Sequence, residues 1–246
     1  MNKAITEGLV LMPPAFTAGL NLWSSNNGRP GDASYQGVTN AALVTNDQHF
    51  GGCLELQKTA ATQKLRCFTQ TPLRQDMYLR ITARVKAIAG NLPSVRIAAW
   101  VGNLAEANVG GVVQAGPTVQ LTKYGEVVTV EAIVGAGNRT GVTMAWGASA
   151  TFAHVGLDLT GSNGGTVRID DLTIEDITQV FLRDMMDMVD VRDYGAKGDG
   201  TTNDSAAFLA ADAAAAGRTI LVSSGSYHLP ANLTINSPIR FQGTVI

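Results

Sequence analysis

The chain has few of the residues and motifs on which metal, redox and nucleotide chemistry depends. Two cysteines and three histidines occur among its 246 residues, and their spacing fits no zinc site. A G-x-S-x-G elbow, a P-loop and a dinucleotide-binding fingerprint are also missing from the sequence. We therefore expect no cofactor, no catalytic metal and no enzyme of these classes.

Charge and long apolar runs are scarce as well. Charged residues make up 15% of the chain and the formal net charge is -2. The sequence therefore gives no overall positive potential that would attract nucleic acid. No apolar stretch approaches the roughly 20 residues of a membrane-spanning helix, which argues against membrane insertion. A cleavable signal peptide is not recognisable at the N-terminus.

The two cysteines sit on opposite parities of the pattern around them. Cys53 alternates with Leu54 and Leu56, whereas Cys67 shares the parity of Leu65. If both sets of leucines face one core, the two thiols point to opposite faces. The sequence therefore favours two ordinary thiols over a disulfide.

Apolar residues are abundant, and between residues 50 and 177 they recur with period two. In residues 78–88, Leu79, Ile81 and Val85 fall on one face and Arg80 and Arg84 on the other. The same alternation returns in residues 94–101, 127–134 and 154–159. Half-buried antiparallel strands explain it. About eight or nine such strands with glycine-rich turns and no clear helix predict a β-sandwich.

Residues 166–177 close this series, and their alternation changes phase. Val167 and Ile169 share one parity, whereas Leu172 and Ile174 share the other. One extra residue near Asp170-Asp171, a β-bulge, would return all four to one buried face. The segment G-T-V-R-I-D-D-L-T-I-E-D resembles the final strand of jelly-roll carbohydrate-binding modules. This resemblance implies a jelly-roll-like β-sandwich over residues 1–177 that binds carbohydrate.

The pattern changes at Val189. The run V-D-V-R-D-Y-G-A-K-G-D-G predicts one short strand and then an irregular turn built on three glycines. A helix is expected over residues 205–216, with Asn203 or Asp204 as its N-cap and Gly217 as its stop. Its apolar face would be Ala207, Phe208, Ala211 and Ala215. Short β runs are predicted at residues 219–222, 233–235 and 239–241.

The order D-Y-G-A-K-G-D-G-T-T-N-D-S-A-A, the helix ending in glycine and the later G-S-Y resemble the opening segment of the pectate-lyase superfamily. That superfamily includes polygalacturonase- and rhamnogalacturonase-like right-handed parallel β-helices, and phage tailspikes carry the same opening. The resemblance spans residues 189–227. It implies that residues 189–246 hold the N-terminal cap and first coils of a truncated β-helix, and that catalytic residues belong to later coils, so none is expected here.

Together these patterns predict an all-β chain. A jelly-roll-like β-sandwich over residues 1–177 would be followed by the start of a right-handed parallel β-helix with one capping α-helix, over residues 189–246. Between them, residues 178–188 read T-Q-V-F-L-R-D-M-M-D-M. This run is too apolar for a flexible tether, so we expect a packed linker, with a short helix as one form.

A sugar-binding sandwich needs an aromatic ring for the apolar face of a sugar and polar groups for its hydroxyls. Trp100 is the main candidate, because parity places it beside Arg96 and opposite the aliphatic residues. The same face is expected to carry Arg80, Glu131 and Asp158. The alternative is that this face is only solvated, that its charges pair across strands and that a loop covers Trp100.

The residues around the other two tryptophans predict whether each is exposed or buried. Trp23 lies in the polar run N-L-W-S-S-N-N-G-R-P-G-D, either as an exposed stacking residue or as a lid over the edge of the sandwich. Trp146 shares the parity of Val142 and Met144 and is expected in the core.

Acidic and amide side chains cluster in two ways. A structural calcium ion is one possibility, because calcium prefers oxygen ligands. Such ligands occur at Asn26, Asn27, Asp32, Asp170 and Asp171. A second group lies beside glycines, at Asp190, Asp193, Asp199 and Asp204. Short polar side chains in such places fix turns and cap helices, so we expect a structural role for them.

The leading hypothesis is a polysaccharide-binding and polysaccharide-degrading protein, of the glycoside hydrolase or polysaccharide lyase type. The alternative is a structural adaptor or receptor-binding tailspike or fibre component of a phage or phage-like particle. Either function is extracellular or virion-associated. The expected partners are a polysaccharide and, through the unpaired β edge of residues 239–246, other copies of the chain, for example in a homotrimer.

Overall fold

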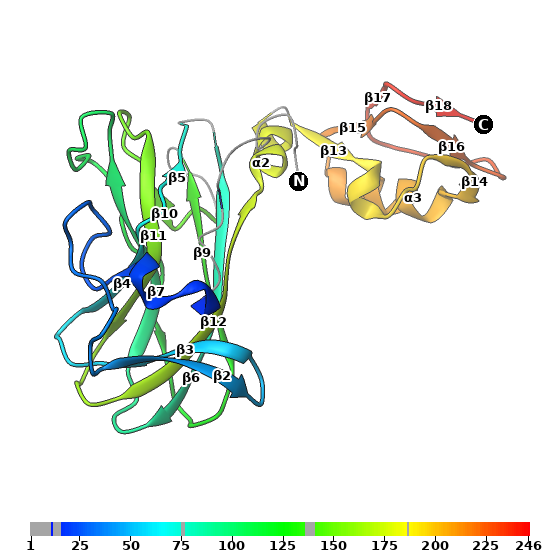
Figure 1. The fold of residues 1–246 in the computed structure, drawn as a ribbon. Coiled ribbons are helices and arrows are strands. Elements are labelled where there is room, and N and C mark those ends of the chain that lie inside the picture. The colour runs from blue at the N-terminus through cyan, green and yellow to red at the C-terminus, as the bar shows by residue number, and fades with distance from the viewer. Residues whose placement is uncertain (1–10, 12–15, 75–76, 136–140, 186) are drawn as a thin grey trace. The chain divides into compact units, whose positions relative to one another are not determined.

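A computed structural model describes residue 11 and residues 16–74, 77–135, 141–185 and 187–246. The chain divides into two compact units, Met1–Thr178 and Gln179–Ile246. Each unit is drawn in Figure 1. Across the described residues, no helix combines the length and apolarity needed to cross a bilayer.

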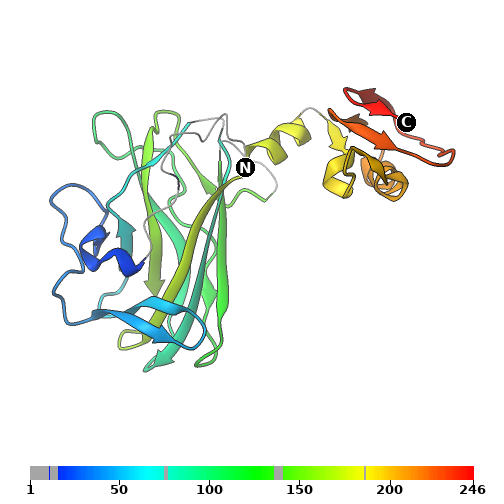
Figure 2. The same ribbon diagram turned by 45° about the vertical axis from the view of Figure 1, so that its right-hand side comes forward.

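The first unit is a β-sandwich of two sheets, seen facing each other in Figure 2. Sheet I runs in the order β1 (Trp23–Ser24), β4 (Gln63–Cys67), β11 (Phe152–Thr160), β7 (Ser94–Gly102) and β8 (Val119–Gln120), with β5 (Thr71–Pro72) also paired to β11. Sheet II runs in the order β10 (Met144–Ala145), β9 (Val128–Gly135), β6 (Leu79–Ala89), β12 (Thr166–Asp176), β3 (Gly51–Gln57) and β2 (Ala41–Asp47). Two short 3-10 helices, η1 (Phe16–Ala18) and η2 (Leu20–Leu22), precede β1. The predicted sandwich is confirmed.

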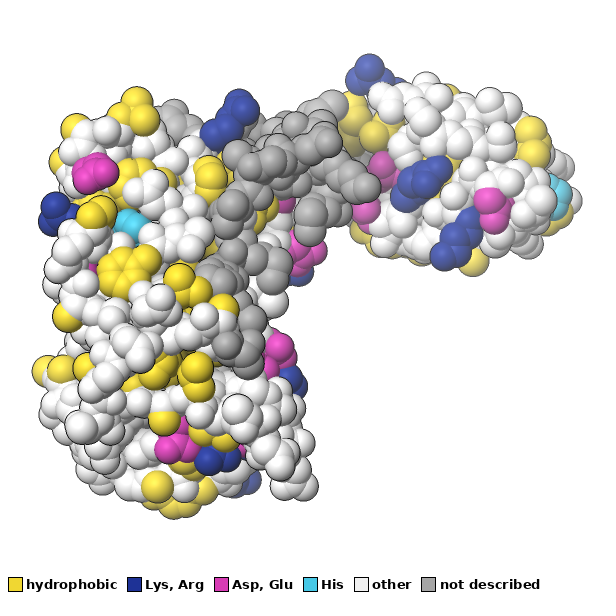
Figure 3. All heavy atoms as spheres, in the orientation of Figure 1, with side chains coloured by type: hydrophobic (Ala, Val, Ile, Leu, Met, Phe, Trp, Pro, Cys, Tyr) yellow, Lys and Arg dark blue, Asp and Glu magenta, His cyan; other side chains and the backbone are white. Residues whose placement is uncertain are grey.

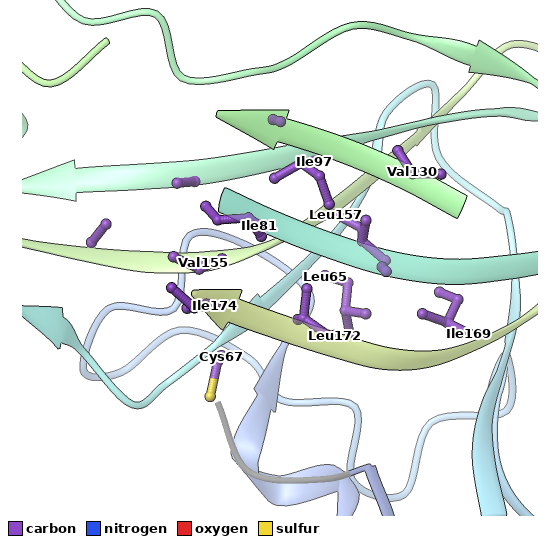
Figure 4. Packing of buried hydrophobic residues seen from close by; sticks show 14 of the residues in the cluster. Leu65, Cys67, Ile81, Ile97, Val130, Val155, Leu157, Ile169, Leu172 and Ile174 are labelled. Carbon is purple, nitrogen blue, oxygen red and sulfur yellow. The ribbon is translucent and has the colours of Figure 1, made fainter. Parts of the chain in front are cut away.

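The core of the sandwich consists of the apolar residues that alternate along both sheets. Figure 4 shows Ile97 and Leu157 of sheet I meeting Ile81 and Ile174 of sheet II. Trp146 is buried in the same cluster, as its parity predicts. Burying these side chains stabilises the fold by about 25 cal/mol for each Å² of apolar surface removed from water.

The two cysteines are free and both are buried. Cys67 belongs to the core cluster of the sandwich. Cys53 has the parity opposite to the core residues Leu54 and Leu56 of β3. The thiols therefore lie on opposite faces of their sheets, as the alternation indicates.

The predicted bulge in β12 is present. The pairing of β12 with β6 shifts register between Asp170 and Thr173, and Asp171 adopts a positive φ of 50°. Because of this extra residue, Val167, Ile169, Leu172 and Ile174 all belong to the buried core.

The second unit is a coil of short parallel strands. After α2 (Thr178–Met185), the chain forms β13 (Met188–Asp190), the 3-10 helix η3 (Val191–Tyr194), β14 (Asp199–Asn203), α3 (Ser205–Ala215), β15 (Thr219–Val222), β16 (Ser226–His228), β17 (Ile239–Phe241) and β18 (Thr244–Val245). Strands β13, β15 and β17 form one parallel sheet, and β14, β16 and β18 form another. Because the chain alternates between the two sheets, each turn adds one strand to each, which is the construction of a parallel β-helix.

Helix α3 has the buried face that the sequence predicts, Ala207, Phe208, Ala211 and Ala215. It packs on η3, β13 and β15, and Figure 2 shows it alongside the strands of this unit. Its end is marked by a left-handed Ala216 and by Gly217, with φ of 49° and 91°. The helix α2 lies within the predicted linker, and the packing of that linker between the units stays a prediction.

Two local predictions in the second unit are wrong. Residues 199–200, read as part of an irregular turn, begin strand β14, which pairs with β16. Residues 233–235, read as a strand, are irregular. The following amides of Asn236 and Ser237 donate to the Asp212 carboxylate of α3, so this stretch is anchored by a side chain instead of a ladder.

Gly156 of β11 provides a test of the packing in sheet I. A Cβ at this position would lie 1.8 Å from the carbonyl oxygen of Leu65 on β4. We expect Gly156→Ala to destabilise the sandwich by about 1–3 kcal/mol, as overpacked substitutions do, measured by urea denaturation. Gly110→Ala, where a Cβ meets nothing within 4 Å, is the control. Equal stability of the two variants would contradict this packing.

Candidate functional site

The pairing of β7 with β11 brings together most of the polar and aromatic residues on the outer face of sheet I. In this antiparallel register Trp100 lies opposite His154, and Arg96 lies opposite Asp158. Both pairs have the parity opposite to core residues such as Ile97 and Leu157, so they belong to the outer face. We call this face, with its four paired residues, the sheet I outer face.

The aromatic end of the sheet I outer face is a cluster of three rings. The ring centroids of Trp100 and His154 are 5.9 Å apart, and those of Trp100 and Phe152 are 6.0 Å apart. His154 and Phe152 meet edge to face at 5.6 Å. Gly102 leaves room for them, since a Cβ there would lie 2.4 Å from the Phe152 ring and 2.7 Å from Trp100.

His154 is held in one neutral tautomer. Its Nδ1 lies 3.0 Å from the carbonyl oxygen of Cys67; a carbonyl only accepts, so Nδ1 carries the proton and donates. Burial lowers the pKa of His154, which keeps the ring uncharged at neutral pH. Its Nε2 is therefore an acceptor, and it is buried without a hydrogen-bond partner in the part of the chain that the structure describes.

The charged end of the sheet I outer face is centred on Asp158. One oxygen of this carboxylate accepts from Nη2 of Arg66 at 2.7 Å, and the other accepts from Nη2 of Arg96 at 3.1 Å. Arg66 is buried and also donates to the carbonyl oxygen of Leu157. The Arg96 side chain keeps 31% of its surface exposed, so it is the member of this group that an external ligand reaches first.

A loop of the N-terminal region covers the aromatic end. The guanidinium carbon of Arg29 lies 5.3 Å from the centroid of the Trp100 ring. A Cβ on Gly28 would come within 2.8 Å of the His154 side chain, so the loop backbone packs directly on that ring. Lys64 of β4 donates to the side-chain oxygen of Asn27 at 2.9 Å. As a result Trp100 is only 6% exposed.

The structure separates the residues that were expected on one face. Trp100, Arg96 and Asp158 lie together, but Arg80 of β6 and Glu131 of β9 belong to the outer face of sheet II. The prediction of a single face is therefore wrong. Parity separates inside from outside, but it does not say to which of two sheets a strand belongs.

Arg80 and Glu131 are involved in ion pairs with their neighbours. Arg80 lies 3.8 Å from Glu131 and 3.2 Å from Glu175. This is the cross-strand pairing that the sequence allows as an alternative to binding. Figure 3 shows basic and acidic side chains as scattered spots on the face in view.

Trp23 is not exposed. It is fully buried, belongs to the core cluster and stacks against Phe16 at 4.5 Å between ring centroids. Of the two expectations for Trp23, the exposed stacking residue is wrong, because the polar loop begins only after β1, where Trp23 pairs with Cys67 of β4.

Sequence reasoning missed Arg29, Arg66 and Phe152 as parts of this face. Phe152 shares the parity of His154 and Asp158, so extending the alternation by two residues would have found it. Arg66 and Arg29 are brought in by pairing and loop contacts between residues far apart in sequence, for which a single sequence carries no signal.

The oxygen-bearing residues considered for calcium do not form one site. Asp32 accepts from the backbone amides of Asn27 and Arg29 and from the side chain of Asn26. Asp170 and Asp171 lie in β12, on sheet II. Among the described residues, no group of three or more His, Cys, Asp and Glu side chains is arranged to hold a metal ion.

The aspartates of the second unit were expected to hold turns, and Asp190, Asp199 and Asp204 make contacts of this kind. Asp190 accepts from the amide of Arg192 at the start of η3. Asp199 accepts from the amides of Thr201 and Thr202. Asp204 accepts from the amides of Lys197 and Gly198 in the glycine turn.

Comparisons with known proteins give different matches for different parts of the chain. Residues 188–245 match the family described as rhamnogalacturonase A/epimerase, pectate lyase-like. A search of curated proteins finds no match. No family is shown for the chain as a whole.

Among solved structures, the xylan-binding domain CBM22-1 of Xyn10C from Paenibacillus barcinonensis is 12% identical, with a TM-score of 0.41, over 68% of this chain and 97% of that domain. The module TmCBM61, solved with β-1,4-galactotriose, is 12% identical with a TM-score of 0.40, over 66% and 94% of the two chains. The enzymatically active domain of tailspike protein 4 from bacteriophage CBA120 is 12% identical, with a TM-score of 0.35. That match covers 64% of this chain and 22% of the tailspike chain. These scores are low, so the sandwich rests on the strand pairing described above.

The outer face of sheet II holds a buried charge cluster that is structural. Asp47 accepts from Lys86 and from Arg168, each at 2.7 Å, and Arg168 also binds Glu55 at 2.9 Å. Burial raises the pKa of the Asp47 carboxyl, but hydrogen bonds from Lys86, Arg168 and two backbone amides outweigh it and hold the pKa well below its usual range.

This cluster predicts a pH dependence of stability. Because the folded pKa of Asp47 lies below the unfolded value of about 3.9, its contribution is present above that value and is lost as the pH falls below it. Asp47→Asn should lower the free energy of unfolding at neutral pH by about 3–5 kcal/mol, since it leaves Lys86 buried without its partner. It should also weaken the decline in stability between about pH 5 and pH 2.

Asp171→Asn is the matched control, because Asp171 forms an exposed ion pair with Arg84 and should cost less than about 1 kcal/mol. Denaturant unfolding at several pH values measures both variants. An Asp47 variant as stable as the control at neutral pH would contradict the assignment.

Proposed function

We propose that the sandwich binds a polysaccharide through the sheet I outer face. Trp100 is the stacking ring for the apolar face of a sugar, and Arg96 and Asp158 hydrogen-bond hydroxyl groups further along the chain of sugars. The observation that carries this proposal is the register of β7 and β11, which aligns the aromatic pair and the charged pair on one surface.

The spacing of the two pairs favours a polymer as the ligand. Trp100 and Arg96 are four residues apart on β7, which corresponds to about 13 Å along an extended strand. One pyranose ring is too short to contact both, whereas consecutive sugars of a polysaccharide can.

The second unit supports a polysaccharide-directed function. Its parallel coil and its match to the pectate lyase-like family agree with the opening of a β-helix that acts on polysaccharides. We assign hydrolysis or β-elimination to further coils of such a β-helix. The described aspartates Asp190, Asp199 and Asp204 hold turns, so they are not assigned a catalytic role. A protein with this function works outside the cell or on a virion, where polysaccharides are met.

The polysaccharide proposal is tested by a glycan array probed with the full chain. We expect selective binding to one class of polysaccharide, and at least a ten-fold loss of affinity in Trp100→Ala, because stacking on an aromatic ring supplies much of the binding energy in such sites. Arg80→Ala, which removes a charge from the outer face of sheet II, should bind as the unchanged protein does. Equal binding by Trp100→Ala would reject this face as the site.

A second function, a structural component of a phage-like fibre or adaptor, is favoured by exposed apolar side chains on β17 and β18. Phe241 is 55% exposed and Val245 39% exposed. Exposed apolar side chains are a surface on which another chain can pack, and a homotrimer is one assembly that would cover them.

Light scattering coupled to size exclusion tests this self-association. We expect the mass to rise above 25.8 kDa with protein concentration, and Phe241→Asp to shift the chain toward monomer. Leu104→Asp is the control, because Leu104 is an exposed apolar residue of the sandwich. A monomer at every concentration would contradict association through the exposed side chains of β17 and β18.

A further inference from the structure

The loop above Trp100 has the properties of a separate, hinged element. Ser24 and Ser34 form an antiparallel bridge at its base, and the amide of Ser25 donates to the carbonyl oxygen of Ala33. Inside the loop, Asp32 accepts from the amides of Asn27 and Arg29. Residues 25–33, here called the lid, are therefore braced internally and closed at their base.

The lid contacts sheet I through few interactions. In the described part of the chain, the side-chain hydrogen bond between the lid and sheet I is the one from Lys64 to Asn27. In addition, Arg29 lies over Trp100, and the backbone of Gly28 packs against His154 and the carbonyl oxygen of Cys67. A loop that is braced internally and held on the sheet by a few local contacts can move as a unit at small cost.

The closed position of the lid conflicts with sugar binding at Trp100. A cation over an aromatic face is attracted by the ring quadrupole, and Arg29 occupies the face on which the ring of a sugar would stack. The Arg29 side chain belongs to an exposed residue, so it can leave the ring for water.

The closed state also leaves an unsatisfied group beneath the lid. Nε2 of His154 is a buried acceptor without a partner among the described residues, and His154 is 1% exposed. An unpaired buried acceptor costs free energy, and a hydroxyl donor admitted by opening the lid would remove that cost. Trp100 and His154 are register partners, so one ligand can reach both.

We propose that residues 25–33 are an autoinhibitory lid, in which Arg29 holds the place of a sugar on Trp100, and that polysaccharide binding requires the lid to open and uncovers His154 as a hydrogen-bond acceptor. This inference rests on the proposed function, since it describes the regulation of the same face.

The test uses the full chain and the variant Arg29→Ala, which keeps the backbone hydrogen bond from residue 29 to Asp32. Acrylamide quenching of tryptophan fluorescence measures the accessibility of Trp100, with Trp100→Phe as the background that subtracts Trp23 and Trp146. Affinity electrophoresis in xylan, β-1,4-galactan and polygalacturonate measures binding. We expect Trp100 to become more quenchable and the affinity to rise about two- to five-fold, the equivalent of one exposed cation–π contact.

A second variant opens the lid by another route. Gly28→Ala introduces a Cβ 2.8 Å from His154 at a φ of +85°, so it should displace the lid with Arg29 still present and again expose Trp100. Arg80→Ala is the control for the loss of one positive charge and should change neither readout.

The outcomes separate the lid from the proposed function. Unchanged quenching and unchanged affinity in Arg29→Ala would overturn the lid, and so would weaker binding, because Arg29 would then be a ligand contact. Increased quenching of Trp100 in both variants, without binding of any of the three polysaccharides by any form, would support the lid and reject the polysaccharide function.

Discussion

The antiparallel pairing of β7 with β11 is the constraint on which the sandwich and its candidate site depend. Nine consecutive residue pairs link the two strands, and they lie in the middle of sheet I. Their inward residues supply half of a core that no single sheet could bury. Their outward residues are placed by the same register, so the aromatic and charged pairs follow directly from a pairing that the core requires.

The polar groups of this face are arranged so that little buried charge is left alone. Asp158 is shared between a buried and a partly exposed arginine, and such a shared carboxylate is stabilised only while both partners keep their positions. Among the described residues the exceptions on this face are Nε of Arg66 and, at the aromatic end, Nε2 of His154. Buried groups without partners are rare in folded proteins, and Nε2 of His154 lies under the loop that covers Trp100, where a ligand would arrive.

Much of the fold could be predicted, because period-two alternation reports the burial of each strand locally. Parity placed Trp100, Arg96 and Asp158 outside, and the phase change at Asp171 located the bulge. The assignment of strands to sheets could not be predicted in this way. Strands β6 and β7 are consecutive and separated by residues 90–93, a length typical of a hairpin, yet they belong to opposite sheets. Arg80 and Arg96 therefore lie on different faces, and the loop contact of Arg29 depends on the same non-local arrangement.

Binding of a polysaccharide along β7 and β11 can be followed by titrating the isotopically labelled chain with the polysaccharide and recording its backbone amide resonances. We expect the shifts to concentrate on β7, on β11 and on residues 25–33, with the largest near Trp100 and His154. Shifts confined to sheet II or to the second unit would contradict binding along β7 and β11 and place the site elsewhere.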